Sequence, residues 1–124
     1  MIEEAYVSFE TSKLLKEKGF DVSVRYYYQK IDDDITYNIG DFRNWNVHDM
    51  WYSMPTQQMA MQWLREAHNI HIDICSICDI LHWLYQVFVI TPKTARNPYV
   101  DKILYTSYEQ AVEAAILYTL KNLI

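Results

Sequence analysis

Apolar and polar residues alternate along residues 21–29, which predicts a β-strand with one buried face. Three aspartates at residues 32–34 interrupt this pattern, and we expect residues 35–39 to return as its hairpin partner. Residues 40–52 follow no period, so we predict a polar loop that carries Phe and Trp side chains. In the first strand, Val22, Val24, Tyr26 and Tyr28 alternate with Ser23, Arg25, Tyr27 and Gln29.

Three segments have the spacing of amphipathic helices. Residues 8–18 predict the first, and Gly19 follows where a left-handed residue ends many helices. The second covers residues 55–68 and opens on a proline, which suits the first helical turn. The third begins at the Ser-Tyr-Glu-Gln capping box of residues 107–110 and continues toward the end of the chain.

The second half of the chain alternates in the same way. Isoleucine occupies every second position of residues 70–74, whereas residues 82–91 are apolar on both faces and should form a central strand. Residues 102–106 predict an antiparallel return. The order α-β-β-α-β-β-β-α predicts a single α+β domain over residues 1–124, with about three helices packed on an antiparallel sheet of three to five strands.

Large side chains supply the predicted core. The chain has 11 Tyr, 4 Trp and 4 Phe but only 2 Gly and 3 Pro, a composition that excludes a disordered linker. The helix stripes and the central strand place Trp63, Leu64, Phe88, Ile116 and Leu120 in this core.

Charge and cysteine content narrow the expected partners. The net charge of −5 argues against nucleic acid, because proteins that bind it carry a basic face. The first residues lack the basic start and apolar run of a secretion signal, and no apolar stretch is long enough to span a membrane. Two cysteines without an export signal favour reduced thiols and a cytoplasmic location.

One group of residues has the donor types of a zinc site: His71, Cys75, Cys78 and His82. All four fall within one short connection, whereas structural zinc sites usually join two separated pairs. The other interpretation is a pair of free, reduced cysteines beside two histidines, and we predict that Cys75 and Cys78 are free thiols.

No other motif points to catalysis. Arg65, Glu66 and His68 lie together at the end of the second predicted helix and fit a polar surface. The three aspartates at 32–34 lack the alternation and the glycine of a calcium loop. With glycine only at 19 and 40, no loop can cradle a phosphate. We therefore expect neither an enzyme nor a bound cofactor.

Aromatic residues are the remaining candidates for a binding site. Tyr27, Trp45, Trp51 and Tyr52 lie in or near the first predicted hairpin and suit a protein interface or a ligand groove. The alternative is that these rings cover the core of a glycine-poor domain.

Residues 52–57 (Tyr-Ser-x-Pro-Thr-Gln) and 63–72 (Trp-Leu-Arg-Glu-x-His-Asn-Ile-His-Ile) resemble a family of short proteins from Bacteroides-type bacteria and their phages. Residues 8–20 and 105–111 are similar to that family too, so the likeness spans most of the chain. The family has no assigned activity. The resemblance therefore implies a source and a fold, and it transfers no functional residue.

From these observations we expect a non-enzymatic accessory protein that binds an unknown protein partner or itself. The alternative is a small metal-binding or small-molecule-binding protein using His71, Cys75, Cys78 and His82. A third possibility is an acidic decoy for a nucleic-acid-binding protein. Because Leu117, Tyr118 and Ile124 widen the apolar arc of the final helix, we favour a homodimer, although these residues also suit packing under the loop at residues 40–52.

Overall fold

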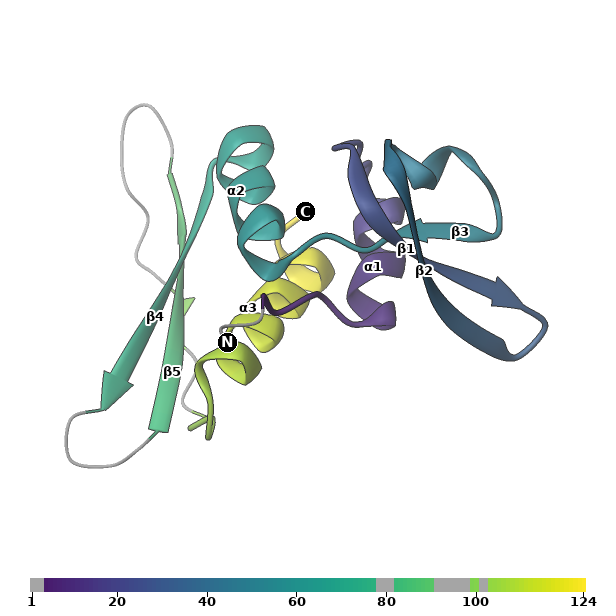
Figure 1. The fold of residues 1–124 in the computed structure, drawn as a ribbon. Helices are drawn as coiled ribbons and strands as arrows, with labels where there is room; N and C mark the ends of the chain where they lie inside the picture. Colours follow the sequence, from purple (N-terminus) through teal and green to yellow (C-terminus); the bar gives the residue numbers. More distant parts are fainter. Residues whose placement is uncertain (1–3, 78–81, 91–98, 101–102) are drawn as a thin grey trace. The chain divides into compact units, whose positions relative to one another are not determined.

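The computed structural model of this chain describes residues 4–77, 82–90, 99–100 and 103–124. These residues form three α-helices and two antiparallel sheets, which confirms the α+β class and the predicted order of elements with one short strand added (Figure 1). The chain divides into two compact units, Met1–Met59 and Ala60–Ile124. The expectation of a single domain over residues 1–124 stays a prediction.

The first unit contains α1 (Phe9–Glu17), β1 (Val24–Ile31), β2 (Asp34–Arg43), the 3-10 turn η1 (Trp45–Val47) and β3 (Trp51–Ser53). Its strands pair in the order β2-β1-β3, so β1 is central and β2 is an edge. The hairpin between β1 and β2 closes through a two-residue turn in which Asp32 has a φ of 54°.

Both ends of α1 follow from the sequence. The Ser8 Oγ accepts a hydrogen bond from the Thr11 N–H at 3.2 Å, which caps the first turn. Gly19 has a φ of 89°, and the Phe20 N–H donates to the Leu15 carbonyl at 2.9 Å. Together with the bond from Gly19 N–H to the Lys16 carbonyl, this is a Schellman ending, as the position of Gly19 predicts.

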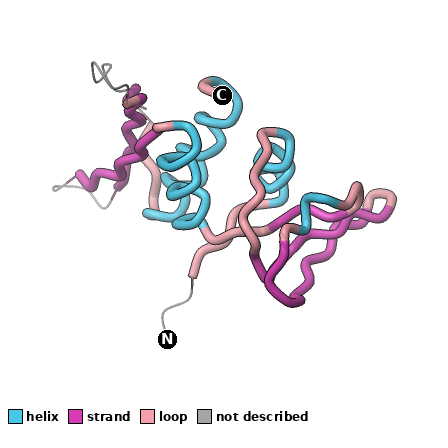
Figure 2. The backbone as a smooth tube through the Cα atoms, turned by 90° about the horizontal axis from the view of Figure 1, so that it is seen from above, coloured by secondary structure: helices cyan, strands magenta, loops and turns pink. Residues whose placement is uncertain are grey.

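The second unit contains most of α2 (Gln57–His68), then β4 (Ile70–Ile77), β5 (His82–Val89), β6 (Tyr99–Val100) and α3 (Tyr108–Asn122). Its strand order β4-β5-β6 confirms that β5 is central. In both views α3 lies along one face of the β4–β5 hairpin (Figures 1 and 2). The capping box is present, because the Ser107 Oγ accepts from the Gln110 N–H at 3.1 Å.

Four expectations need correction. The return strand expected at residues 102–106 is β6 at Tyr99–Val100, and within the described residues 103–106 only Tyr105 pairs, in an isolated bridge with Trp83. Two sheets of three strands replace the single sheet expected, because β1, β2 and β3 pair only with one another, as do β4, β5 and β6. Residues 40–52 are not only a loop, because β2 continues to Arg43 and β3 pairs with β1. The first strand begins at Val24, and Val22 lies outside it.

Four of the five predicted core residues are buried: Trp63, Leu64, Ile116 and Leu120. Phe88 is only half-buried, so this part of the prediction is wrong. The reason is strand parity, since Tyr85 and Val87 on β5 are buried on the face that α3 covers, and Phe88 points to the opposite face.

Candidate binding surface of the first unit

Three of the four aromatic residues singled out from the sequence come together on one face of the first sheet. The rings of Tyr27 and Trp45 are stacked with centroids 3.9 Å apart, and the Trp51 ring lies 5.3 Å from each. We call Tyr27, Trp45 and Trp51 the tryptophan cluster. Aromatic pairs in such offset and tilted arrangements stabilise a fold beyond their buried area.

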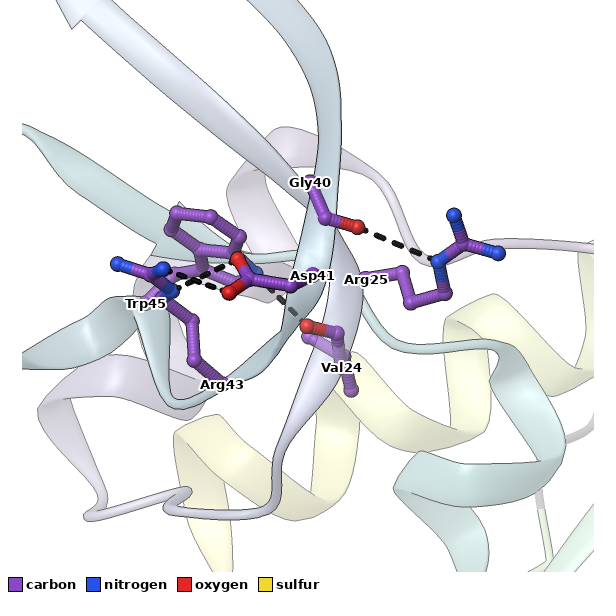
Figure 3. Close-up of polar contacts among 6 residues, drawn as sticks. All are labelled: Val24, Arg25, Gly40, Asp41, Arg43 and Trp45. Atoms are coloured by element: carbon purple, nitrogen blue, oxygen red, sulfur yellow. Dashed lines mark hydrogen bonds and ion pairs between the residues drawn. The ribbon is translucent and has the colours of Figure 1, made fainter.

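Trp45 is fixed at its backbone and at its ring. Its indole Nε1–H donates to the Val24 carbonyl at 2.7 Å (Figure 3). Its backbone N–H donates to the Ser53 Oγ at 3.1 Å. The ring also lies against Gly40, where an added Cβ would come within 2.7 Å of it. With Trp45 only 4% exposed, the centre of the cluster is part of the core of the unit.

The Arg43 guanidinium covers the Trp45 ring at 4.9 Å from its centroid. The same guanidinium donates two hydrogen bonds to the Asp41 carboxylate, from Nε at 3.0 Å and from Nη2 at 2.8 Å (Figure 3). These bonds hold the pKa of Asp41 below its usual value and raise the pKa of Arg43. The pair therefore closes the tryptophan cluster from the β2 side.

Tyr52 is separate from the cluster, because neighbouring strand residues point to opposite faces. Its ring packs edge-on against Phe9 of α1 at 5.1 Å, and the Lys16 ammonium lies 4.6 Å from its centroid. Lys16 Nζ also donates to the Trp51 carbonyl at 2.9 Å, and burial lowers the pKa of Lys16. Tyr52 thus helps to attach α1 to the sheet.

A row of exposed apolar side chains in this unit lies on β2. Ile35, Tyr37 and Ile39 occupy alternate positions of this edge strand, so their side chains share one face. They are 46%, 71% and 54% exposed. We call these three residues the β2 apolar row.

The same three residues direct their backbone polar groups away from β1. Lys30 N–H donates to the Met50 carbonyl and the Tyr26 carbonyl accepts from Met54 N–H, so the even-numbered residues of β1 bond toward β3. Tyr27 and Gln29 consequently bond toward β2, where they face Asn38 and Thr36. The residues of the β2 apolar row, which alternate with these two, have their N–H and C=O groups on the outer side of the strand.

A cavity of about 270 Å³ lies at the end of the same hairpin. The pairing of β1 with β2 is irregular there, with Val24 opposite Arg43 and Tyr26 opposite Ile39. Arg25 lines this cavity and donates from Nε to the Gly40 carbonyl at 3.2 Å (Figure 3). Its guanidinium also lies over the exposed ring of Phe42. Burial raises the pKa of Tyr6, another lining residue. The cavity has room for a small, mainly apolar group.

The described residues of the possible zinc site are spread along the β4–β5 hairpin. His71 and Cys75 share a face but are four positions apart, which is about 13 Å along a strand. His82 lies opposite Ile77, about 20 Å along the hairpin from His71. One zinc ion, with ligands about 2 Å away, cannot bind all three. Cys78 lies outside the described residues.

Cys75 is a free thiol, as expected. Its Sγ donates to the Asp73 carboxylate at 3.6 Å, and burial is the main cause that raises its pKa. A raised pKa reduces the thiolate fraction near neutral pH, so the environment of Cys75 does not favour a nucleophile. The described ranges contain no group of three His, Cys, Asp or Glu side chains placed to share a metal ion.

The polar residues at the end of α2 have ordinary structural partners. Glu66 accepts a hydrogen bond from Gln62 Nε2 at 3.0 Å, one helical turn away. The His68 ring packs edge-on against Trp63, with centroids 4.8 Å apart. These contacts are those of a helix surface and a core margin.

The comparisons with known proteins found no match: no protein-family model, no curated protein and no solved structure is similar to this chain. Within the described residues, no helix is both long and apolar enough to cross a membrane. The β2 apolar row therefore stands as the candidate binding surface on its geometry alone. Sequence alternation predicts a strand there, but its edge position follows only from the strand order.

Proposed function

We propose that this chain is a small, non-enzymatic accessory protein that pairs the outer edge of β2 with an extended segment of another polypeptide. One observation carries the proposal: the β2 apolar row combines exposed apolar side chains with outward-facing backbone groups. A strand that adds to a sheet edge uses both features, since main-chain bonds give affinity and alternate side chains give specificity.

The composition of β2 supports this role. Edge strands that must stay unpaired usually carry lysine, proline or a bulge along their length. Residues 34–39 contain neither lysine nor proline, and the irregular pairing lies beyond Ile39. The apolar row is therefore left without these protective devices.

The non-enzymatic part of the proposal is supported by the tryptophan cluster and by the β4–β5 hairpin. Trp45 is buried and serves packing, and His71, Cys75 and His82 are too far apart to act on one atom or ion. A cytoplasmic location and an origin in a phage or mobile element belong to the same proposal and rest on the sequence.

Pull-down from an extract of the source organism tests the proposal, with three baits compared. Tyr37→Lys places a charge in the apolar row, and Val47→Lys adds the same charge at a second residue that is also 71% exposed, on η1. We expect a partner that binds the wild type and Val47→Lys and is lost with Tyr37→Lys. Cross-linking should place an extended segment of that partner against β2.

A partner that binds all three baits equally would contradict the proposal, because its interface would then lie away from β2. Equal far-UV circular dichroism of the three baits shows that the substitutions leave the fold intact. Both substituted side chains are exposed, so we expect that equality.

A further inference from the structure

We infer that the polypeptide that pairs with β2 is a second copy of this chain, related by a two-fold axis that passes beside Tyr37. The inference rests on the proposed function and identifies the polypeptide that pairs with β2. It begins from a symmetry in the strand itself: the segment Ile35-Thr36-Tyr37-Asn38-Ile39 has the same apolar and polar pattern in both directions.

An antiparallel two-fold pairing exploits that symmetry. With Tyr37 opposite Tyr37 of the second copy, Ile35 lies opposite Ile39 of the second copy, and the reverse pair forms as well. Residues directly opposite each other share a face of the sheet, so the two apolar rows become one continuous patch. The polar pairs between Thr36 and Asn38 then lie on the other face.

The backbone supports the same register. In an antiparallel ladder, alternate opposite residues exchange both of their N–H···O bonds. The outward-facing groups belong to Ile35, Tyr37 and Ile39, which are the residues brought opposite one another in this register. The pairing thus forms about six main-chain hydrogen bonds and joins the two sheets into one of six strands. Moving the axis to Thr36 or Asn38 would leave one residue of each row without its apolar counterpart.

Little charge opposes this contact, although each copy has a net charge of −5. No charged residue lies within the segment from Ile35 to Ile39. At its ends, Asp34 lies opposite Gly40 of the second copy. Beyond the segment, Asp33 lies opposite Asp41 of the second copy, and the Arg43 guanidinium, 2.8 Å from the Asp41 carboxylate, offsets the charge of that residue.

Sedimentation velocity over a range of micromolar concentrations gives the first test. We expect the wild type and Val47→Lys to move from 14.9 kDa toward twice that mass, and Tyr37→Lys to stay at the monomer mass. A single 14.9 kDa species of the wild type at every concentration would overturn the inference, as would a dimer that Tyr37→Lys leaves unchanged.

Single cysteines test the register, in a background where Cys75 and Cys78 are replaced by serine. Tyr37→Cys should form a disulfide-linked dimer under mild oxidation, because the two Cα atoms are about 5.5 Å apart in such a pair. Ile39→Cys is the matched control, since the two copies of residue 39 would be four positions, or about 13 Å, apart. Equal cross-linking of both variants, or of neither, would contradict the register.

The two proposals fail in different ways. If the wild type is monomeric but a pulled-down partner is still lost with Tyr37→Lys, the edge of β2 binds a different chain and only the second-copy inference fails. If neither self-association nor partner capture depends on Tyr37, the proposed function fails too.

Discussion

Two hairpins in this molecule carry nearly the same pattern and bury it differently. In β4, Ile70 and Ile72 alternate with His71 and Asp73 and are 2% and 6% exposed. In β2, Ile35 and Ile39 flank a tyrosine in the same alternation and are 46% and 54% exposed. The difference is the helix α3, which packs on β4 and β5 within the second unit. Alternation therefore defines a face of a strand, and a neighbouring element decides whether that face becomes core.

The largest expected effect tests this contrast directly. Leu120→Ala removes a fully buried side chain of α3 and should lower the free energy of unfolding by about 2–5 kcal/mol. Ile39→Ala removes an exposed side chain and should change it by no more than about 0.5 kcal/mol. Urea unfolding monitored by circular dichroism measures both. Similar losses from the two variants would mean that the β2 apolar row is packed in the monomer.

A second substitution tests how tightly the first unit is packed despite its open edge. A Cβ at Gly40 would lie 2.7 Å from Cη2 and 2.8 Å from Cζ2 of the buried Trp45 ring. Gly40→Ala should therefore cost about 1–3 kcal/mol, as overpacking usually does. The matched control is the same change in a Trp45→Leu background, where the smaller side chain should remove most of the cost. An equal cost in both backgrounds would assign the effect to the backbone.

The sequence predicts the helices and strands themselves better than it predicts which distant elements they contact. Gly19 marks the C-terminal end of α1 and Ser107 marks the start of α3, because both residues act through local backbone geometry. By contrast, the sequence does not predict β3 and η1, since β3 pairs with the distant strand β1 and Trp45 of η1 donates to Val24, 21 residues earlier. Phe88 was misplaced for a related reason: an apolar strand does not show which face a helix will cover.

The candidate site was predictable only in part. Tyr27, Trp45 and Trp51 were expected to act together, and they do lie together, but Trp45 is buried. The sequence predicts residues 35–39 as the hairpin partner of the first strand, yet the outward-facing edge follows only from the pairing register of β1 with both neighbours. His71, Cys75 and His82 are close in the sequence, which suggests a shared site. In the structure they are far apart, because the extended β4–β5 hairpin separates them.

The smallest expected effect concerns the charged cover of the first unit. Because the folded-state pKa of Asp41 is lowered, its ion pair with Arg43 stabilises the fold above the ordinary pKa of an aspartate. That contribution is lost as the pH falls through the lowered pKa. Asp41→Asn should therefore reduce stability slightly at pH 7 and not at all in strong acid, measured as the urea midpoint against pH. A larger deficit in acid than at pH 7 would reverse the assignment.

The tryptophan cluster also gives the first unit an optical signature of its own. Trp45 and Trp51 lie in this unit, and Trp63 and Trp83 lie in the second. Because near-ultraviolet circular dichroism depends on fixed aromatic packing, the stacked and tilted rings of Tyr27, Trp45 and Trp51 should contribute to this signal. The thiol of Cys75 belongs to the second unit. Labelling of this thiol can thus report the unfolding of the second unit independently of the tryptophan cluster.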